Sequence, residues 1–453
     1  MDARSAFLDD YRRLHGRFAG ADRPWLAGLR QRAIDRFAEI GFPAAKNEDW
    51  KYTSVSPILK QRFEPSIALP KRALRKVVSD ALSRAPGLRQ GDGDLVTVFV
   101  NGHYLESFEG RHTTPAVAVS DLARVLAADG DSGAKQIGGV LEPGAHGFIA
   151  LNAAFAVDGA FVHVKKPLER PIHIVHLSIH EASPYVTHPR NVIVVEPGAS
   201  ACIVEHWLGE DGAGYLTNAV TDVFLGRDAS LQHVKVQQET DAAYHVERVE
   251  VRQERGSNYR SHSVALGAAL SRTEIHAELA GEGAECSLYG LYVGSGRRHI
   301  DHHTTIDHAC ARTTSRELYK GILDDNSRGV FTGKVIVRPD AQQISAEQTN
   351  RNLLLAAGAM VETRPQLEIY ADDVKCSHGA AIGRLDEDAL FYMRQRGIDR
   401  KQARSLLTYA FGSEVLDKLG SDVLRRALEK CVLMRIHKDG DGLSEEELEG
   451  VIA

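Results

Sequence analysis

The chain has 453 residues and a formal net charge of −6, from 55 basic and 61 acidic residues. This weakly acidic balance argues against nucleic acid and against a membrane surface as partners, because both favour strongly basic proteins. No apolar run approaches the roughly 20 residues that span a bilayer.

The five cysteines are scattered, and no Cys-x-x-Cys pair occurs. This pattern excludes a disulfide scaffold and a standard zinc finger, and it is typical of a reducing cytosol. The first residues do not resemble a secretory signal. We therefore expect a cytoplasmic protein.

The N-terminal region is predicted to be helical. Apolar residues recur at helical spacing from Phe7 to Phe18, and a second such pattern begins near Pro24 and ends at Gly41. A third helix is expected over residues 73–82.

From Leu95 the pattern changes to β-branched, strand-like runs that continue for almost three hundred residues. Turn-forming sequences separate them at intervals of about 27 to 30 residues, namely at 197–200, 226–230, 255–258 and 281–284. This interval is typical of solenoid repeats, and helical patterns are too rare for the crossovers of a doubly wound sheet. An elongated stack of β-coils is favoured, and a large β-sandwich also fits.

Helical patterns return after Arg384. Asp386 is a predicted N-cap and Gly397 a predicted helix end, and further helices are expected to start at Asp399 and Ser421.

The layout predicts a mainly β protein with three domains. They are an N-terminal helical domain (1–92), a β core (93–383) and a C-terminal helical domain (384–453) that ends in an acidic tail after His437. The tail begins like an EF-hand loop, but its glutamate is out of register for calcium, so we interpret it as solvated.

No nucleotide-binding or hydrolase motif is visible. The stretch from Gly329 to Lys334 is one residue too short for a P-loop and lacks its Ser/Thr, so we interpret it as a strand–turn–strand. Neither GxSxG nor HExxH occurs. We expect a protein that is not an enzyme and binds no nucleotide itself.

Histidine is frequent, at 20 residues, and is concentrated between His299 and His308. His302 and His308 are predicted to share a strand face but to lie roughly 20 Å apart, too far for one ion. His308 and Cys310 could chelate together. We favour the simpler interpretation that these side chains lie on the outer face of the β-stack.

Cys376 and His378 form the most suggestive local group. In an extended strand they point to the same face, with β-carbons about 7 Å apart. Thiolate and imidazole suit zinc, iron or an iron–sulfur cluster, and Lys375 is predicted to favour the thiolate. A cluster needs about four ligands, so such a site is transient or is completed by another chain. A buried structural cysteine beside a hydrogen-bonded histidine is the alternative.

Several segments resemble the SufB/SufD family of the SUF iron–sulfur cluster assembly system. They are residues 327–333 (SRGVFTG), 348–354 (QTNRNLL), 365–380 (PQLEIYADDVKCSHGA), 391–397 (FYMRQRG) and 47–53 (NEDWKYT). The SufB branch is expected to carry a cysteine near residues 348–355, where this chain has none. The Cys-Ser-His-Gly sequence at 376–379 is similar to the SufD branch.

The resemblance implies a right-handed parallel β-helix between two helical domains. It also implies a non-catalytic scaffold subunit of a SufB–SufC–SufD complex, in which a nascent iron–sulfur cluster forms transiently at the SufB interface. By resemblance, Cys376 and His378 lie at that interface, and His378 is the stronger candidate for an iron contact.

SufC, an ABC-type ATPase, would dock on the C-terminal helices. By resemblance, the docking segment contains Tyr392, Arg394, Arg396 and Gly397. In isolation, a homodimer that mimics the SufB pair is expected.

Two other classes stay open. A β-helix carbohydrate-active enzyme would need paired carboxylates, whereas the adjacent Asp372 and Asp373 point to opposite sides of a strand. A stand-alone metal-binding protein would need more ligands than the Cys376 segment provides.

Overall fold

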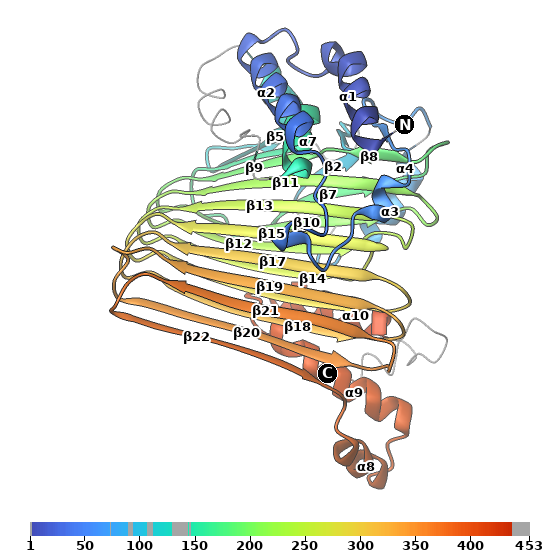
Figure 1. Ribbon diagram of the computed structural model, residues 1–453, viewed down its shortest axis with the longest axis vertical. Coiled ribbons are helices and arrows are strands. Elements are labelled where there is room, and N and C mark those ends of the chain that lie inside the picture. Colours follow the sequence, from blue (N-terminus) through green and yellow to red (C-terminus); the bar gives the residue numbers. More distant parts are fainter. Residues whose placement is uncertain are drawn as a thin grey trace.

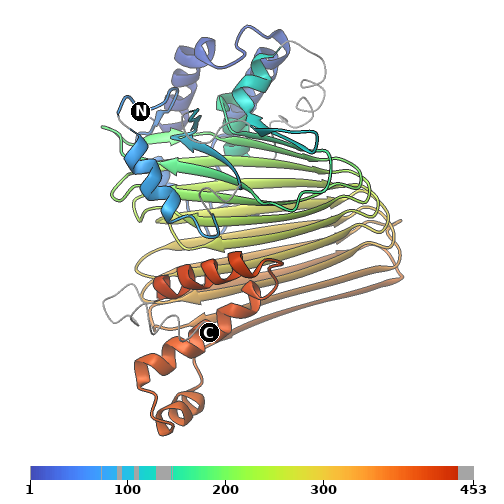
Figure 2. The same ribbon diagram turned by 180° about the vertical axis from the view of Figure 1, so that it is seen from behind.

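The computed structural model describes residues 2–72, 74–88, 94–106, 112–128, 144 and 146–436. It is a β-solenoid of about seven turns with helices at both ends (Figures 1 and 2). Two mostly parallel sheets face each other, and the chain alternates between them, so each coil contributes one strand to each sheet. The predicted mainly β stack is confirmed, and the β-sandwich is excluded.

Each sheet stacks its strands along the solenoid, from the C-terminal end to the N-terminal end. The first sheet contains β21 (Met360–Ile369), β19 (Arg328–Val337), β17 (His299–His308), β15 (Leu270–Leu279), β13 (Tyr244–Gln253), β11 (Tyr215–Leu225), β9 (Arg190–Val195), β6 (Ala160–Val164), β5 (Val117–Asp121) and β4 (His112–Thr113), with β8 (Tyr185–Thr187) and β1 (Glu64–Pro65) attached beside β11. The second sheet contains β22 (Val374–Gly383), β20 (Ile344–Leu354), β18 (Thr314–Leu323), β16 (Glu285–Gly294), β14 (Asn258–Ala265), β12 (Ser230–Gln238), β10 (Ser200–Gly209), β7 (Ile172–Ser178), β2 (Leu95–Val100) and β3 (His103–Tyr104).

The register of the strands explains the sequence repeat. Paired residues of successive coils lie 27 apart at Asn258 and Glu285 and 31 apart at Thr314 and Ser345. In-register partners point to the same face, so like residues form columns along the solenoid. One buried apolar column contains Val223, Val251, Ala277, Ile306 and Val335.

β19 corrects one prediction. It runs through both Gly329 and Gly333 as a single strand, not as a strand–turn–strand. A Cβ on Gly333 would lie 2.3 Å from the Gln348 side-chain nitrogen, so this glycine makes room for a side chain of the opposite sheet.

The predicted N-terminal helices are present. They are α1 (Ala3–Leu14), α2 (Pro24–Ile40) and α4 (Arg75–Ser83), with a short α3 (Ser56–Leu59) between α2 and α4. Among the described residues, the short α3 was not predicted, nor were α5 (Leu122–Ala127) and α7 (Gly147–Phe155). All nine residues of α7 are buried, so it lacks the polar face by which an amphipathic helix is recognised.

Residues 47–53 hold the N-terminal region against the solenoid. Trp50 is buried, and the Arg272 guanidinium of β15 lies 3.8 Å from the centre of its ring. The Thr53 hydroxyl donates a hydrogen bond of 2.5 Å to the buried Asp301 carboxylate of β17. This family-like segment is therefore an anchor between the N-terminal helices and the first sheet.

The C-terminal helices are α8 (Glu387–Gln395), α9 (Arg400–Leu416) and α10 (Asp422–Ile436). The predicted N-cap at Asp386 is confirmed, and Asp399, the predicted start of the next helix, caps that helix; each carboxylate accepts backbone N–H groups of the first turn. α8 ends at Gln395, just before Gly397, where φ is +88°. α9 and α10 pack against the outer face of the second sheet, and α8 projects past the last coil (Figure 2).

Within the described ranges, no helix is both long and apolar enough to cross a bilayer. The expected domain boundary at residues 92 and 93, and the EF-hand-like acidic tail after His437, lie outside the described residues.

Lys320 fixes α9 on the second sheet, and its removal should loosen the helix. Its ammonium group donates to the Phe411 carbonyl at 2.8 Å, pairs with Glu414, and lies 4.5 Å from the Phe411 ring centre. We expect Lys320→Ala to destabilise α9 by about 2 kcal/mol, measured by its amide hydrogen exchange. Arg351→Ala is the control, because Arg351 is 53% exposed and 3.9 Å from Glu414. Equal hydrogen exchange of α9 in both variants would show that Lys320 does not hold this helix on the sheet.

Candidate functional site

The two predicted ligands lie on β22, the last strand of the solenoid. Cys376 pairs in register with Ala346 and His378 with Gln348, both on β20. Cys376 packs in the interior apolar cluster that includes Ala346 and Leu367, so its side chain points between the sheets. His378, two residues further along, is on the same face of the strand. It is exposed because no described coil follows β22.

The expectation that Lys375 favours the Cys376 thiolate is wrong. Lys375 is exposed and lies on the opposite face of β22 from Cys376. Burial raises the pKa of the Cys376 thiol, with a backbone hydrogen bond from Ala346 as a smaller opposing effect. The thiol is therefore predominantly protonated at neutral pH, and a metal ion that binds it must displace the proton.

The two ends of the solenoid differ in how their edges are finished. At the N-terminal end, the sheets finish in β3 and β4, which have two residues each and pair antiparallel. At the other end, β21 and β22 have ten residues each, and no described strand pairs beyond them, so we call this side the free edge (Figure 1). Exposed apolar side chains follow it, namely Met360, Ile369, Tyr370 and Ile382. A long, exposed edge is a template for pairing with another chain.

The histidines between residues 299 and 308 correct a second interpretation. His302 and His308 share a face, as predicted, but that face is buried inside the solenoid and is not the outer surface. The two ring nitrogens of His308 bond the hydroxyls of Thr313 at 2.7 Å and Ser315 at 2.9 Å. The Cys310 thiol donates to the Ala280 backbone carbonyl at 3.1 Å.

A charged cluster inside the solenoid was not predicted. Lys235 of β12 pairs with Glu247 and donates to Thr273 at 2.9 Å, and all three are buried. Burial alone would raise the pKa of Glu247, but Lys235 and His245 lower it to about 2. The only sequence pattern that pointed to this cluster was the alternation of His233, Lys235 and Gln237 with valines, which marks one polar face of the strand.

That alternation was ambiguous because both faces of β12 are covered. Val234 and Val236 face the cluster formed with α9 and α10, and the polar residues face the interior. Alternation separates two faces of a strand but does not say which one points between the sheets.

A second interior polar pair lies beside the candidate site. The Gln348 amide nitrogen donates to the Glu317 carboxylate of β18 at 2.5 Å, and both side chains are buried. Burial raises the pKa of Glu317 to about 7, and the hydrogen bond from Gln348 partly offsets this rise.

The predicted docking segment is exposed at the end of α8. Tyr392 is 57% exposed, and Arg394 and Arg396 are also exposed. The Arg396 guanidinium donates to the Tyr392 hydroxyl at 3.0 Å, and Gly397 follows it directly. The segment therefore presents an aromatic and cationic surface beyond the solenoid.

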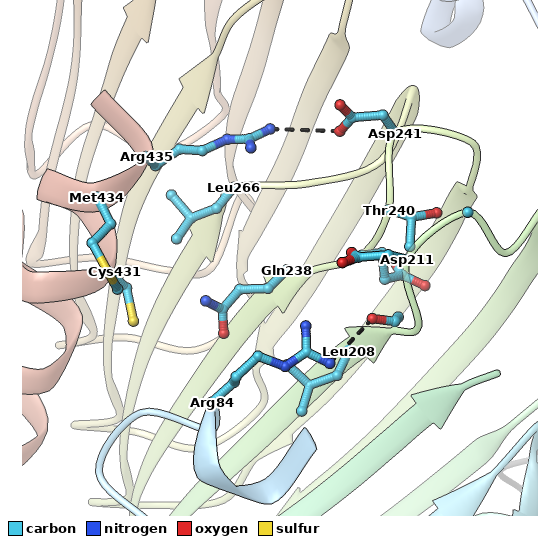
Figure 3. Close-up of a pocket in the computed structure, with 13 residues that line it drawn as sticks. Arg84, Leu208, Asp211, Gln238, Thr240, Asp241, Leu266, Cys431, Met434 and Arg435 are labelled. Carbon is cyan, nitrogen blue, oxygen red and sulfur yellow. Dashed lines mark hydrogen bonds and ion pairs between the residues drawn. The ribbon is translucent and has the colours of Figure 1, made fainter. Parts of the chain in front are cut away.

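A cavity of about 460 Å³ lies where α4, the solenoid and α10 meet (Figure 3). Arg84 donates to the Gly209 carbonyl at 3.4 Å, and Arg435 lies 3.7 Å from the Asp241 carboxylate. Neither Cys376 nor His378 is among its lining residues. The cavity is lined by residues of the N-terminal region, the solenoid and the C-terminal helices, and it is separate from the candidate site.

Over the part of the chain that the structure describes, no three His, Cys, Asp or Glu side chains are grouped so that they could hold a metal ion. Cys376 and His378 therefore do not complete a metal site with other described residues, and their role as ligands stays a prediction.

Comparisons with known proteins match one protein family over nearly the whole chain. The SufBD core domain of the SUF system for iron–sulfur cluster assembly matches residues 178–411, and the SufBD N-terminal region matches residues 1–174. An iron–sulfur cluster assembly SufBD family protein of Synechocystis is 31% identical, with 92% of each chain covered. The iron–sulfur cluster assembly protein SufD of Escherichia coli is 29% identical, with 90% of this chain and 91% of that protein covered. The chloroplastic protein ABCI7 of Arabidopsis thaliana is 32% identical, with 88% and 84% covered.

The buried Glu317 carboxyl should make stability depend on pH. Its pKa is about 7 in the folded chain and ordinarily 4.5, so folding favours the protonated form. The folded state therefore loses stability as pH rises through this window. Glu317→Gln cannot ionise, so its unfolding free energy relative to the parent should rise by about 3 kcal/mol from about pH 4.5 to about pH 8.

Denaturant unfolding across this pH range measures the effect. Glu347→Gln is the matched control, because Glu347 is the exposed neighbour of Gln348 on the same strand. A difference between Glu317→Gln and the parent that stays constant with pH would contradict the prediction.

Proposed function

The chain belongs to the SufBD family of iron–sulfur cluster assembly proteins and is a SufD homologue, and from this we propose that it is a non-catalytic scaffold subunit of a SufB–SufC–SufD complex. In this proposal a nascent cluster is the cargo of the complex. It is bound transiently between this chain and SufB, and the SufC ATPase drives its formation.

The free edge of β21 and β22 carries the proposal. Ten-residue strands with exposed backbone and apolar side chains suit a partner that continues the sheets, whereas the opposite end is closed by two-residue strands. SufB, as a β-helix paralogue, has the matching architecture. The same edge supports a homodimer when SufB is absent.

Cys376 and His378 supply this chain's share of the cluster contacts. Both lie on the same face of β22, the last described strand of the stack, where a second chain would meet them. An iron–sulfur cluster needs about four ligands, so the two that this chain lacks would come from SufB. His378 is the better iron contact, because it is exposed while Cys376 is half-buried.

The C-terminal helices are proposed to bind SufC. Phe391 and Tyr392 are 59% and 57% exposed on α8, beside Arg394 and Arg396. Only residues 384–386 separate α8 from β22. Movement of a docked SufC would therefore act directly on the strand that bears the candidate ligands.

We also propose that the chain acts in the cytoplasm and binds no nucleotide itself. All five cysteines are unpaired, as expected where thiols are kept reduced. The ATP that drives assembly would be bound and hydrolysed by SufC.

Partner identity is tested by co-expression. With SufB and SufC, the tagged chain should co-purify both in a stable complex, and the chain alone should hydrolyse no ATP. Gel filtration of the chain alone tests the homodimer. Recovery of neither partner would contradict the scaffold proposal.

His378→Ala should leave the complex assembled but reduce the maturation of iron–sulfur enzymes in cells, because it removes an iron contact without touching the core. Ser377→Ala is the control, since Ser377 is the exposed neighbour on the opposite face of β22. Normal maturation with His378→Ala would make this histidine dispensable.

SufC docking is best tested on the surface of α8. Deleting all residues after Arg384 would expose the apolar face that α9 and α10 cover, so loss of binding could reflect misfolding. Phe391→Asp with Tyr392→Ala should instead weaken SufC binding at least tenfold while SufB pairing persists. Val423→Asp is the control, because Val423 is 43% exposed but lies on α10. Unchanged SufC affinity of the α8 variant would overturn the docking assignment.

A further inference from the structure

Three family-like segments that are far apart in sequence meet beside His378. Residues 327–333 end at Gly333 on β19, residues 348–354 begin at Gln348 on β20, and residues 365–380 include His378 on β22. Gln348 is the in-register partner of His378, and it also lies against Gly333 of the opposite sheet. Their meeting point is the side-chain amide of Gln348.

The position of this amide is fixed from one side by Gly333. A Cβ at residue 333 would come within 2.3 Å of the amide nitrogen and 2.8 Å of the amide carbon. Any side chain there would displace the amide. Gly333 therefore lets Gln348 extend across the interior toward the first sheet.

The direction of the amide is fixed by Glu317. Its carboxylate accepts the hydrogen bond from the Gln348 Nε2 group at 2.5 Å. With Nε2 directed at Glu317, the Gln348 oxygen points away from this contact. Gln348 is only 1% exposed, so this oxygen, Oε1, is shielded from water. It also has no hydrogen-bond partner among the described residues.

We propose that Gln348 is a positioning residue for His378: its free Oε1 accepts the ring N–H of His378 and so holds the other ring nitrogen, with its lone pair, toward the open edge. Register partners on adjacent parallel strands have their side chains side by side, and an exposed side chain changes rotamer freely. In the proposed arrangement, the His378 side chain rotates so that its N–H meets the buried oxygen.

Metal-binding histidines commonly donate the N–H of the ring nitrogen that does not bind the metal to a protein acceptor, which fixes the orientation of the ring. Gln348 would play this acceptor role for His378. A hydrogen bond to one ring nitrogen selects the tautomer and leaves the other nitrogen free to bind a metal ion. The importance of the outward nitrogen for iron rests on the proposed function. The selection of the tautomer by Gln348 does not.

The tautomer of His378 can be measured directly in the isolated full-length chain. Histidine labelled with ¹⁵N reports which ring nitrogen carries the proton, and the signal of His378 is identified by its loss in His378→Gln. We expect Gln348→Leu, which keeps the side-chain size but removes the acceptor, to change the tautomer ratio roughly 2- to 10-fold. Gln348→Glu, which keeps an acceptor oxygen, should change it less.

Asn352→Leu is the matched control. Asn352 is a buried amide on the same strand, and its register partner is Ile382, so its loss perturbs the interior without touching His378. If Gln348→Leu does not fold, Gly333→Ala displaces the amide by steric conflict and should shift the ratio in the same direction.

A tautomer ratio that is the same in the parent, Gln348→Leu and Gly333→Ala would overturn the proposal, as would an equal shift in Asn352→Leu. Maturation of iron–sulfur enzymes with His378→Ala is measured in parallel. Normal maturation of iron–sulfur enzymes with His378→Ala would contradict the proposed function. The tautomer ratio would still decide the role of Gln348.

Discussion

A parallel β-coil cannot stand alone, and this constraint organises the whole molecule. Each strand needs a neighbour to satisfy its backbone N–H and C=O groups, and each coil needs another to cover its interior. At the N-terminal end, short antiparallel strands and the packed helices α2 and α7 meet this need. At the other end, no described strand meets it for β21 and β22. The place where the described stack stops is also the place where the candidate ligands lie.

In-register stacking explains how distant segments converge there. Each coil adds about thirty residues, so Glu317, Gln348 and His378 form one column across β18, β20 and β22. β22 forms part of the free edge and carries both candidate ligands, and α8 follows it directly in the chain. Only residues 384–386 connect α8 to β22, so a force applied to α8 would act on this strand.

The interior contains buried polar and charged side chains as well as apolar ones. Lys235 with Glu247, and Glu317 with Gln348, are buried charged or polar groups that are expensive to desolvate and that are retained with specific partners. Helices α9 and α10 cover the outside of the second sheet with an apolar layer, so apolar burial is supplied there as well as in the interior. This double layer allows polar columns to occupy part of the space between the sheets.

The sequence by itself determined the strand repeat, the flanking helices, the helix caps at Asp386 and Asp399, and the shared face of Cys376 and His378, because these depend on local periodicity and spacing. It did not reveal α7, whose residues are buried on all sides, or the burial of His302 and His308. The opposite faces of Lys375 and Cys376 follow from strand alternation alone, whereas the burial that raises the pKa of the Cys376 thiol came from the tertiary structure. Only the tertiary structure decided which face of each strand points inward, because that depends on what covers the other face. It also decided that Gly333 and Gln348 meet beside His378, because register joins residues that no local pattern connects.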